Sequence, residues 1–379
     1  GRAKGGVIFE KIDRRYRPFS YLGYRTIGFM NENNEGAGLE YSFDSYLAGK
    51  DGQALYQKIA GGKWMPVFDG SEVKPVDGYD LHTTINVNIQ DVTEAALLSA
   101  LKEHDADYGC AIVMEVKTGE IKAISNLTKN HTNKSYREVF NYAVQGLTDP
   151  GSTFKLASMI ALLEDSKLDL NDSIDTGMGN YNYYNHVMRD HKPGGYGQIS
   201  VKQAFEYSSN IAISKLVNTH FGSNPQAFID YIRSFGLAQP LGFQMAGEGI
   251  PRIKSPSDKS WSGISLPWMS IGYEVELTPL QILAFYNGIA NNGRMIRPVI
   301  VKSISSADKD IKRYESEVIV RKLCSSGTLK KVRSLLEGVV ENGTASNIKN
   351  SHYKIAGKTG TAQKIINGRY TKQYNTSFV

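Results

Sequence analysis

The sequence predicts an α+β fold. Helical and strand patterns are mixed along the 379 residues, without the regular strand–helix–strand alternation of a parallel α/β sheet. No internal repeat is present. A hydrophobic fraction of 41% and a charged fraction of 22% allow a sizeable core and argue against disorder. The length suits about two domains, and we expect one large domain with a smaller companion.

The first part of the chain differs in composition from the rest. Residues 1–75 are rich in glycine, tyrosine and charge and show no long helical period, so we expect a loop-rich, mostly extended module. The polar, proline-containing stretch around 70–78 reads as a linker. We therefore predict two domains, 1–75 and 76–379.

Both ends of the chain look cut. The chain begins with Gly1 rather than Met, has no signal peptide and contains no run of 18 apolar residues. At the other end, 376–378 reads as the start of a strand. We interpret the sequence as a fragment of a longer protein, with the second domain truncated at its C-terminus.

The second domain is predicted to open with a β-branched strand at 81–85 and a helix through Leu97 and Leu101. Residues 109–124 then read as strand, turn, strand. Ser200 and Gln203 form a possible capping box for a later helix. Residues 277–290 read as another helix, with Pro279 near its first turn and Asn291-Asn292-Gly293 ending it.

The pattern is also helical after Ser152. Leu156, Met159, Ile160 and Leu163 follow i, i+3, i+4, i+7 spacing and predict one apolar face. Such a helix places the side chain three residues after the serine beside it. Ser152 is thus predicted to lie in the first turn, where unpaired N–H groups and the helix dipole favour anionic charge.

A serine nucleophile needs a base within hydrogen-bond reach, and Ser-x-x-Lys supplies one on a helix. This pattern occurs six times and is weak alone; it begins at Ser71, Ser99, Ser152, Ser306, Ser346 and Ser351. Only Ser152 precedes a convincing apolar helix, after a Pro150-Gly151 turn, with Lys155 as the candidate base. The ordinary alternative is that Ser152 is a helix cap and Lys155 a solvated charge.

Two further patterns follow in order. Ser208-Ser209-Asn210 is the one Ser-x-Asn of the chain, in a predicted turn between helices. Lys-Thr-Gly occurs twice: the copy at 117–119 is predicted at a hairpin tip, and the copy at 358–360 on a strand over 353–363. Small neighbours of the second copy let an extended peptide approach its backbone. A phosphate-binding loop is excluded because His352 stands where that motif needs glycine.

The three patterns together identify a resemblance to class B penicillin-binding proteins. The resemblance covers nearly the whole chain; it is carried by PGSTFK at 150–155, SSN at 208–210, KTGTA at 358–362, GLEYSFDSYLAGKDG at 38–52, DLHTTINVNIQ at 80–90, GYEVELTPLQ at 272–281 and NTSFV at 375–379. Asn86 stands where the family pattern has Asp. The segment 375–379 resembles the opening of the strand after Lys-Thr-Gly.

The resemblance implies a fold and a reaction. The fold is a penicillin-binding-protein/β-lactamase-like transpeptidase domain, an antiparallel sheet flanked by helices, with 1–75 as a pedestal (dimerisation-like) fragment. In the reaction, Ser152 attacks the penultimate D-alanine of a stem peptide and releases the terminal one. Lys155 accepts the proton as a neutral amine, which burial and the charge of Lys358 favour. Ser208 relays the proton, and Asn210 holds Lys155 and the substrate amide.

Substrate binding is implied for the second Lys-Thr-Gly. Lys358 and Thr359 bind the terminal carboxylate of the substrate or of a penicillin, and Gly360 leaves room for it. Backbone N–H groups of Ser152 and Thr361 form the oxyanion hole. An amine from a neighbouring stem peptide then resolves the acyl-enzyme and forms the cross-link. No metal or organic cofactor is implied.

The resemblance also predicts where the protein works and what it binds. The resemblance implies an extracytoplasmic domain that an N-terminal helix, absent from this sequence, anchors to the bacterial cytoplasmic membrane. It also implies division or cell-wall partners bound through the pedestal, and a septal role.

A net charge of +6 with no basic run argues against nucleic acid as a partner. A β-lactamase or D,D-carboxypeptidase, or a non-catalytic β-lactam sensor or scaffold, are the alternatives. Cys110 and Cys324 are expected to be buried and unpaired.

Overall fold

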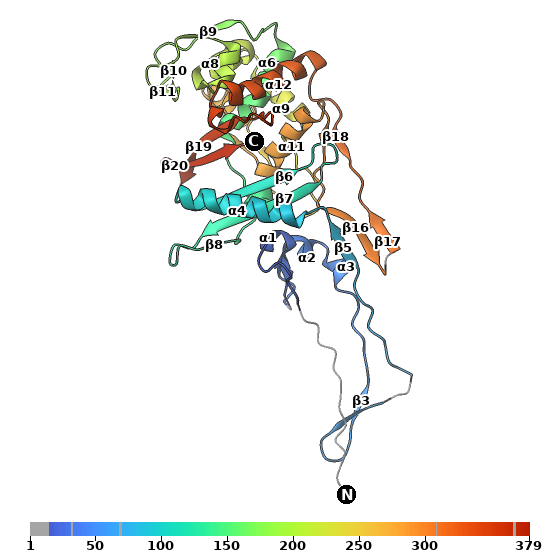
Figure 1. Cartoon of the computed structure of the whole chain (residues 1–379). Coiled ribbons are helices and arrows are strands. Elements are labelled where there is room, and N and C mark those ends of the chain that lie inside the picture. Colours follow the sequence, from blue (N-terminus) through green and yellow to red (C-terminus); the bar gives the residue numbers. More distant parts are fainter. Residues whose placement is uncertain (1–14, 32, 68–69, 308, 367–368) are drawn as a thin grey trace.

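The computed structural model describes residues 15–31, 33–67, 70–307, 309–366 and 369–379 (Figure 1). It combines helices with strands, as the α+β prediction requires, and the pairings between its named strands are antiparallel. Within these residues no helix is both long and apolar enough to cross a membrane.

The N-terminal part consists of short elements: α1 (Tyr24–Ile27), β1 (Phe29–Met30), β2 (Gly36–Ala37), α2 (Gly38–Ser42), α3 (Asp44–Leu47), β3 (Tyr56–Lys58) and β4 (Trp64–Pro66). The β3–β4 hairpin lies on a narrow arm that extends away from the rest of the molecule (Figure 1). Of the predicted pedestal, residues 1–14, 32 and 68–69 lie outside the described part of the chain.

A three-stranded sheet follows the arm. β5 (Asp80–Thr83) pairs with β16 (Val301–Ser306), which also pairs with β17 (Lys309–Arg313). Asn86 then caps α4 (Val87–Glu103), because its side-chain oxygen accepts the backbone N–H groups of Asn88 and Ile89 at 3.0 and 3.2 Å. Asparagine thus performs a helix-capping role at this position.

A second sheet lies against α4. It is formed by β6 (Tyr108–Met114), β7 (Ile121–Lys129) and β8 (Tyr136–Arg137), and α4 packs along β6 and β7 (Figure 1). The predicted hairpin at 109–124 is confirmed. Cys110 of β6 is partly buried, whereas Cys324 is buried as predicted, and both are free thiols.

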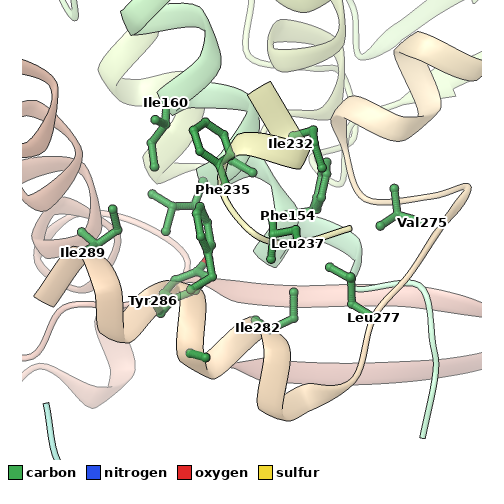
Figure 2. Packing of buried hydrophobic residues seen from close by; sticks show 14 of the residues in the cluster. Phe154, Ile160, Ile232, Phe235, Leu237, Val275, Leu277, Ile282, Tyr286 and Ile289 are labelled. Carbon is green, nitrogen blue, oxygen red and sulfur yellow. The ribbon is translucent and has the colours of Figure 1, made fainter. Parts of the chain in front are cut away.

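The core of the domain is helical: α5 (Tyr142–Gln145), the 3₁₀ turn η1 (Gly151–Phe154), α6 (Lys155–Asp165), α7 (Val201–Glu206), α8 (Asn210–Phe221), α9 (Pro225–Ser234), α10 (Ser265–Ser270), α11 (Pro279–Ala290) and α12 (Ser326–Glu341). Figure 2 shows Phe154, Ile160, Phe235 and Tyr286 meeting in this core. The capping box of Ser200 and the helix starting at Pro279 are confirmed.

The prediction of one apolar face for α6 is wrong. Every residue from Lys155 to Leu162 is buried, while Leu163 is only partly buried. The reason is that α6 lies at the centre of the domain and contacts α8, α9 and α12, so no face of its first two turns meets solvent.

The remaining short elements connect the helices: β9 (Ser173–Asp175), β10 (Asn180–Tyr183), β11 (His186–Arg189), β12 (Gln198–Ser200), β13 (Arg252–Ile253), β14 (Val275–Glu276), β15 (Met295–Ile296), β18 (Val318–Val320) and η2 (Ser346–Ile348). They pair in twos, as β10 with β11, β9 with β12, β13 with β14, and β15 with β18.

The last hairpin corrects two predictions. β19 (Thr359–Ile366) begins six residues later than the predicted strand at 353–363, and its ladder with β20 (Arg369–Phe378) runs from the Thr359–Phe378 pair to the Ile366–Arg369 pair. Lys358 adds one more pair of backbone hydrogen bonds, to Val379. Residues 376–378 form the end of β20 rather than the start of a strand.

Candidate functional site

Ser152 lies in the 3₁₀ turn η1, three residues before α6 begins at Lys155, and not in the first turn of the α-helix as predicted. Gly151 allows the tight approach: its φ is +55°, and its N–H donates to the carbonyl of Gly272 at 3.1 Å. The buried hydroxyl of Tyr286 donates to the carbonyl of Thr153 at 2.7 Å and so ties η1 to α11. Ser152 is partly buried, and its hydroxyl has no hydrogen-bond partner among the described side chains and backbone. The hydroxyl is therefore available to a ligand.

Lys155 is the first residue of α6 and is fully buried. Its Nζ donates to the Ser208 carbonyl at 2.6 Å, to Asn210 Oδ1 at 2.7 Å and to Ser208 Oγ at 3.1 Å. Burial, together with the charge of Lys358, holds the pKa of this amine well below its usual range, although Asp190 opposes the shift. Lys155 is thus an amine in which the neutral form is favoured.

Ser208, Ser209 and Asn210 form the turn between α7 and α8. Ser208 has a φ of +58°, an uncommon conformation for a residue with a side chain. This conformation directs both its carbonyl and its hydroxyl toward Lys155.

Asp190 fixes this turn, and the sequence analysis missed it. The Ser209 hydroxyl donates to its carboxylate at 2.9 Å, and the Ile211 N–H donates to it at 3.0 Å. In addition, Asn210 Nδ2 donates to the carbonyl of Arg189 at 2.9 Å. Asp190 follows β11 and is about twenty residues from the turn that it holds, so no local pattern pointed to it.

Lys358 immediately precedes β19 and is fully buried. Its Nζ donates to the Thr359 carbonyl at 3.0 Å and lies 5.8 Å from the centre of the Phe205 ring. Burial lowers the pKa of this amine to about 7. Lys358 is therefore a cation that lacks a carboxylate partner among the described residues, which suits it to binding an anion.

The residues after Lys358 face the turn that holds Ser152. A Cβ built on Gly360 would lie 2.9 Å from Thr153 Cγ2, and one built on Gly151 would lie 2.8 Å from the Thr361 carbonyl oxygen. Gly151 therefore packs on the backbone of Thr361, whereas Gly360 is enclosed by the side chains of Ser377 and Thr153, and this close approach requires glycine at 360. The Thr359 hydroxyl shares a hydrogen bond of 2.6 Å with Thr344, and Thr361 is exposed.

The structure thus brings the eight predicted site residues together from three separate elements: η1 with α6, the α7–α8 turn, and β19. The other Lys-Thr-Gly lies in the β6–β7 turn, where Lys117 is exposed. Among the described residues, no group of three or more histidine, cysteine or acidic side chains is arranged to hold a metal.

Comparison with known proteins gives a consistent result. The family model described as penicillin binding protein transpeptidase domain matches residues 109–379. Stage V sporulation protein D of Bacillus subtilis (strain 168) is 30% identical over 375 residues, which is 97% of this chain and 57% of that protein. Peptidoglycan D,D-transpeptidase FtsI of Escherichia coli (strain K12) is 28% identical over 380 residues, 97% of this chain and 60% of that protein. The chain therefore spans little more than half the length of these relatives.

Solved structures match along nearly the whole chain. Penicillin binding protein 3 from Mycobacterium tuberculosis, in its apo form, has a TM-score of 0.79 at 26% identity, covering 96% of this chain and 80% of that one. The same protein complexed with ampicillin has a TM-score of 0.80 at 26% identity, covering 97% of this chain and 79% of that one.

Proposed function

Because the chain belongs to the penicillin-binding protein transpeptidase family, we propose that it is a serine D,D-transpeptidase that cross-links peptidoglycan stem peptides through an acyl-enzyme on Ser152. The observation that carries the proposal is the buried Lys155 amine between Ser208 and Asn210, whose pKa is lowered by its burial and, after that, by the charge of a second buried lysine, Lys358. A buried, neutral amine one helical turn after a free serine hydroxyl is the base that an acyl transfer needs.

In the first half-reaction, Ser152 Oγ attacks the carbonyl carbon of the penultimate D-alanine, and Lys155 Nζ takes the hydroxyl proton. A neutral amine has two hydrogens for three neighbouring oxygens. Its longest contact, 3.1 Å to Ser208 Oγ, is the one that can reverse direction and pass a proton on. Through this hydroxyl the proton reaches the leaving amine as the C–N bond breaks, and terminal D-alanine departs.

Binding and charge stabilisation come from the strand side. Lys358 and Thr359 bind the terminal carboxylate, and the N–H groups of Ser152 and Thr361 receive the developing oxyanion. The close packing of Gly360 on Thr153 supports this assignment, because it brings the strand against the catalytic turn. The acyl-enzyme is then attacked by an amine of a second stem peptide, which forms the cross-link and restores Ser152.

We further propose that the domain works on the extracytoplasmic face of the cytoplasmic membrane in septal synthesis, and that the pedestal, 1–75, binds partner proteins. Exposed apolar side chains on the arm, such as Trp64 and Leu55, support the last point. The relatives named FtsI and Stage V sporulation protein D support the first.

The decisive experiment is labelling with a fluorescent penicillin followed by mass spectrometry of the adduct. We expect one covalent adduct on Ser152, and no adduct in Ser152→Ala. An adduct on another residue, or unchanged labelling of the variant, contradicts the assignment. The lifetime of the adduct separates this function from a β-lactamase: hydrolysis within seconds contradicts a transpeptidase, whereas a persistent adduct supports it.

A further inference from the structure

A cleft of about 920 Å³ opens beside the catalytic turn, and no role above uses it. Its walls include 147–149 ahead of η1, 251–254 around β13, Glu274 and Glu276 at β14, and 362–364 of β19. The lining of the cleft includes Asp149, three residues before Ser152, and Ala362, one residue after Thr361. It continues the candidate site along the same strand.

Two of the basic residues that line this cleft form ion pairs with carboxylates of the same lining. Lys254 Nζ lies 2.8 Å from Glu274 Oε2, and both side chains are about four-fifths buried. Arg252 Nη1 lies 3.1 Å from Glu276 Oε2. Arg252 and Lys254 are therefore not free to neutralise a further carboxylate. Of the other two basic residues in the lining, Arg233 Nη1 lies 3.7 Å from Asp230 Oδ1, and Lys364 Nζ lies 4.3 Å from the centre of the Tyr108 ring.

Asp149 is that further carboxylate. Among the described residues it has no ion pair, and its hydrogen bond comes from the backbone N–H of Val275. Burial, reinforced by the negative charges of Glu276 and Glu274, raises the pKa of Asp149 to about 7. A cation bound beside Asp149 would relieve both the burial and the repulsion.

A peptide in the active site can deliver such a cation. An extended chain paired with β19 advances about 3.3 Å per residue, so two or three residues beyond Thr361 bring it to the cleft. Cross-linking also requires a stem peptide that presents an amine. We propose that this cleft binds the amine-bearing diamino acid of a peptidoglycan stem peptide, with Asp149 as the counter-charge of its ammonium group. The inference rests on the proposed function and makes Asp149 a positioning residue.

The binding test uses the tripeptide L-Ala-γ-D-Glu-L-Lys and the same peptide with its side-chain amine acetylated. By titration calorimetry, we expect the wild-type chain to bind the free-amine peptide more tightly than the acetylated one. Asp149→Asn should weaken binding of the free-amine peptide by about tenfold, the usual worth of a hydrogen bond to a charged group, and leave the acetylated peptide unaffected. Equal affinity of the two peptides for the wild type overturns the proposal, and this comparison needs no variant.

Asp310→Asn is the matched control. It removes one exposed carboxylate on β17, where Asp310 lies 3.7 Å from Arg313, and both affinities should stay at their wild-type values. An equal loss in Asp310→Asn and Asp149→Asn would reveal a general charge effect and contradict a site at Asp149.

The diamino acid can belong to the donor stem or to the acceptor stem, and kinetics separate the two sources. If the diamino acid belongs to the donor stem, Asp149→Asn should lower the rate of Ser152 acylation by an amine-bearing D-Ala-D-Ala peptide and leave the rate with the acetylated peptide unchanged. If it belongs to the acceptor stem, Asp149→Asn should leave the acylation rate unchanged and lower the ratio of transfer to the tripeptide amine over hydrolysis of the acyl-enzyme. If neither step depends on the amine, the proposal is wrong. Penicillin labelling of Ser152 is measured separately, so failure of the transpeptidase function is distinguishable from failure of the cleft.

Discussion

The same tripeptide, Lys-Thr-Gly, occurs twice in this chain and has opposite physical character in the two places. At 117–119 it forms the turn between β6 and β7: Lys117 is exposed, and the Thr118 hydroxyl donates to Glu115 at 2.5 Å. At 358–360 it enters β19: Lys358 is fully buried with its pKa lowered to about 7. The residues are identical, so the surroundings alone create the difference.

The comparison teaches which property makes such a lysine useful. A solvated ammonium is satisfied by water and attracts an anion weakly, whereas a buried one lacks that solvation and gains more from a carboxylate. Burial also places Lys358 close enough to Lys155 to lower the pKa of that amine. Each prediction below changes one residue in both copies, or compares the two copies under one condition.

The largest effect is expected for the lysines. Lys358→Ala should lower the rate constant for penicillin acylation of Ser152 by about 10²–10³-fold, because it removes the carboxylate partner and the charge beside Lys155. Lys117→Ala should stay within about twofold of wild type, as expected of an exposed side chain. Stopped-flow or gel-based labelling measures both. Similar rates for the two variants would remove the proposed role of Lys358.

The glycines should separate function from stability. A Cβ on Gly360 would collide with Ser377 Oγ of β20 and would lie 2.9 Å from Thr153 Cγ2, so Gly360→Ala should shift β19 relative to the turn that holds Ser152 and slow acylation by about 10²-fold. A Cβ on Gly119, which has a φ of +77°, would lie 2.6 Å from the Arg297 carbonyl oxygen. Gly119→Ala should therefore cost about 1–3 kcal/mol of stability while the folded fraction acylates normally. Slow acylation in folded Gly119→Ala would contradict this separation.

The pH dependence of stability should also differ between the two copies. Lys358 has a pKa of about 7 in the folded protein, below the 10.5 that is usual for lysine, so between these two values the unfolded chain binds more protons. The free energy of unfolding should consequently rise as pH increases from 7 toward 10. Lys155, whose pKa is also lowered, should contribute to this rise. Lys358→Met should reduce this rise and stabilise the protein at pH 7 by about 1–4 kcal/mol.

Urea unfolding at several pH values measures this effect, and Lys117→Met is the control. Its pH profile should run parallel to that of the wild type. A Lys358→Met profile that is also parallel to the wild type would mean that Lys358 is not held with a lowered pKa.

The threonines should give the smallest effect. Thr359→Val removes a hydroxyl that shares a hydrogen bond with Thr344 and that we assign to the ligand carboxylate, so acylation should slow by about 3–10-fold. Thr118→Val removes only the bond to Glu115 and should leave the acylation rate unchanged. An unchanged rate in Thr359→Val would restrict carboxylate binding to Lys358 and the backbone.

The sequence by itself determined the local structure. The hairpin at 109–124, the capping box of Ser200 and the helix that begins at Pro279 were all predicted correctly, because each depends on residues within a few positions of one another. The choice of Ser152 and Lys358 as candidates likewise rested on order and spacing along the chain, and their roles stay predictions.

Tertiary structure alone decided the electrostatics and the boundaries of the long-range contacts. The sequence could not show that the first two turns of α6 are buried on all sides, or that Asp190 holds the turn beside Lys155. Nor could the sequence show that the pKa values of Lys155 and Lys358 are lowered. All of these depend on which side chains, far apart in sequence, exclude water from a shared volume, and a local pattern contains no information about that packing.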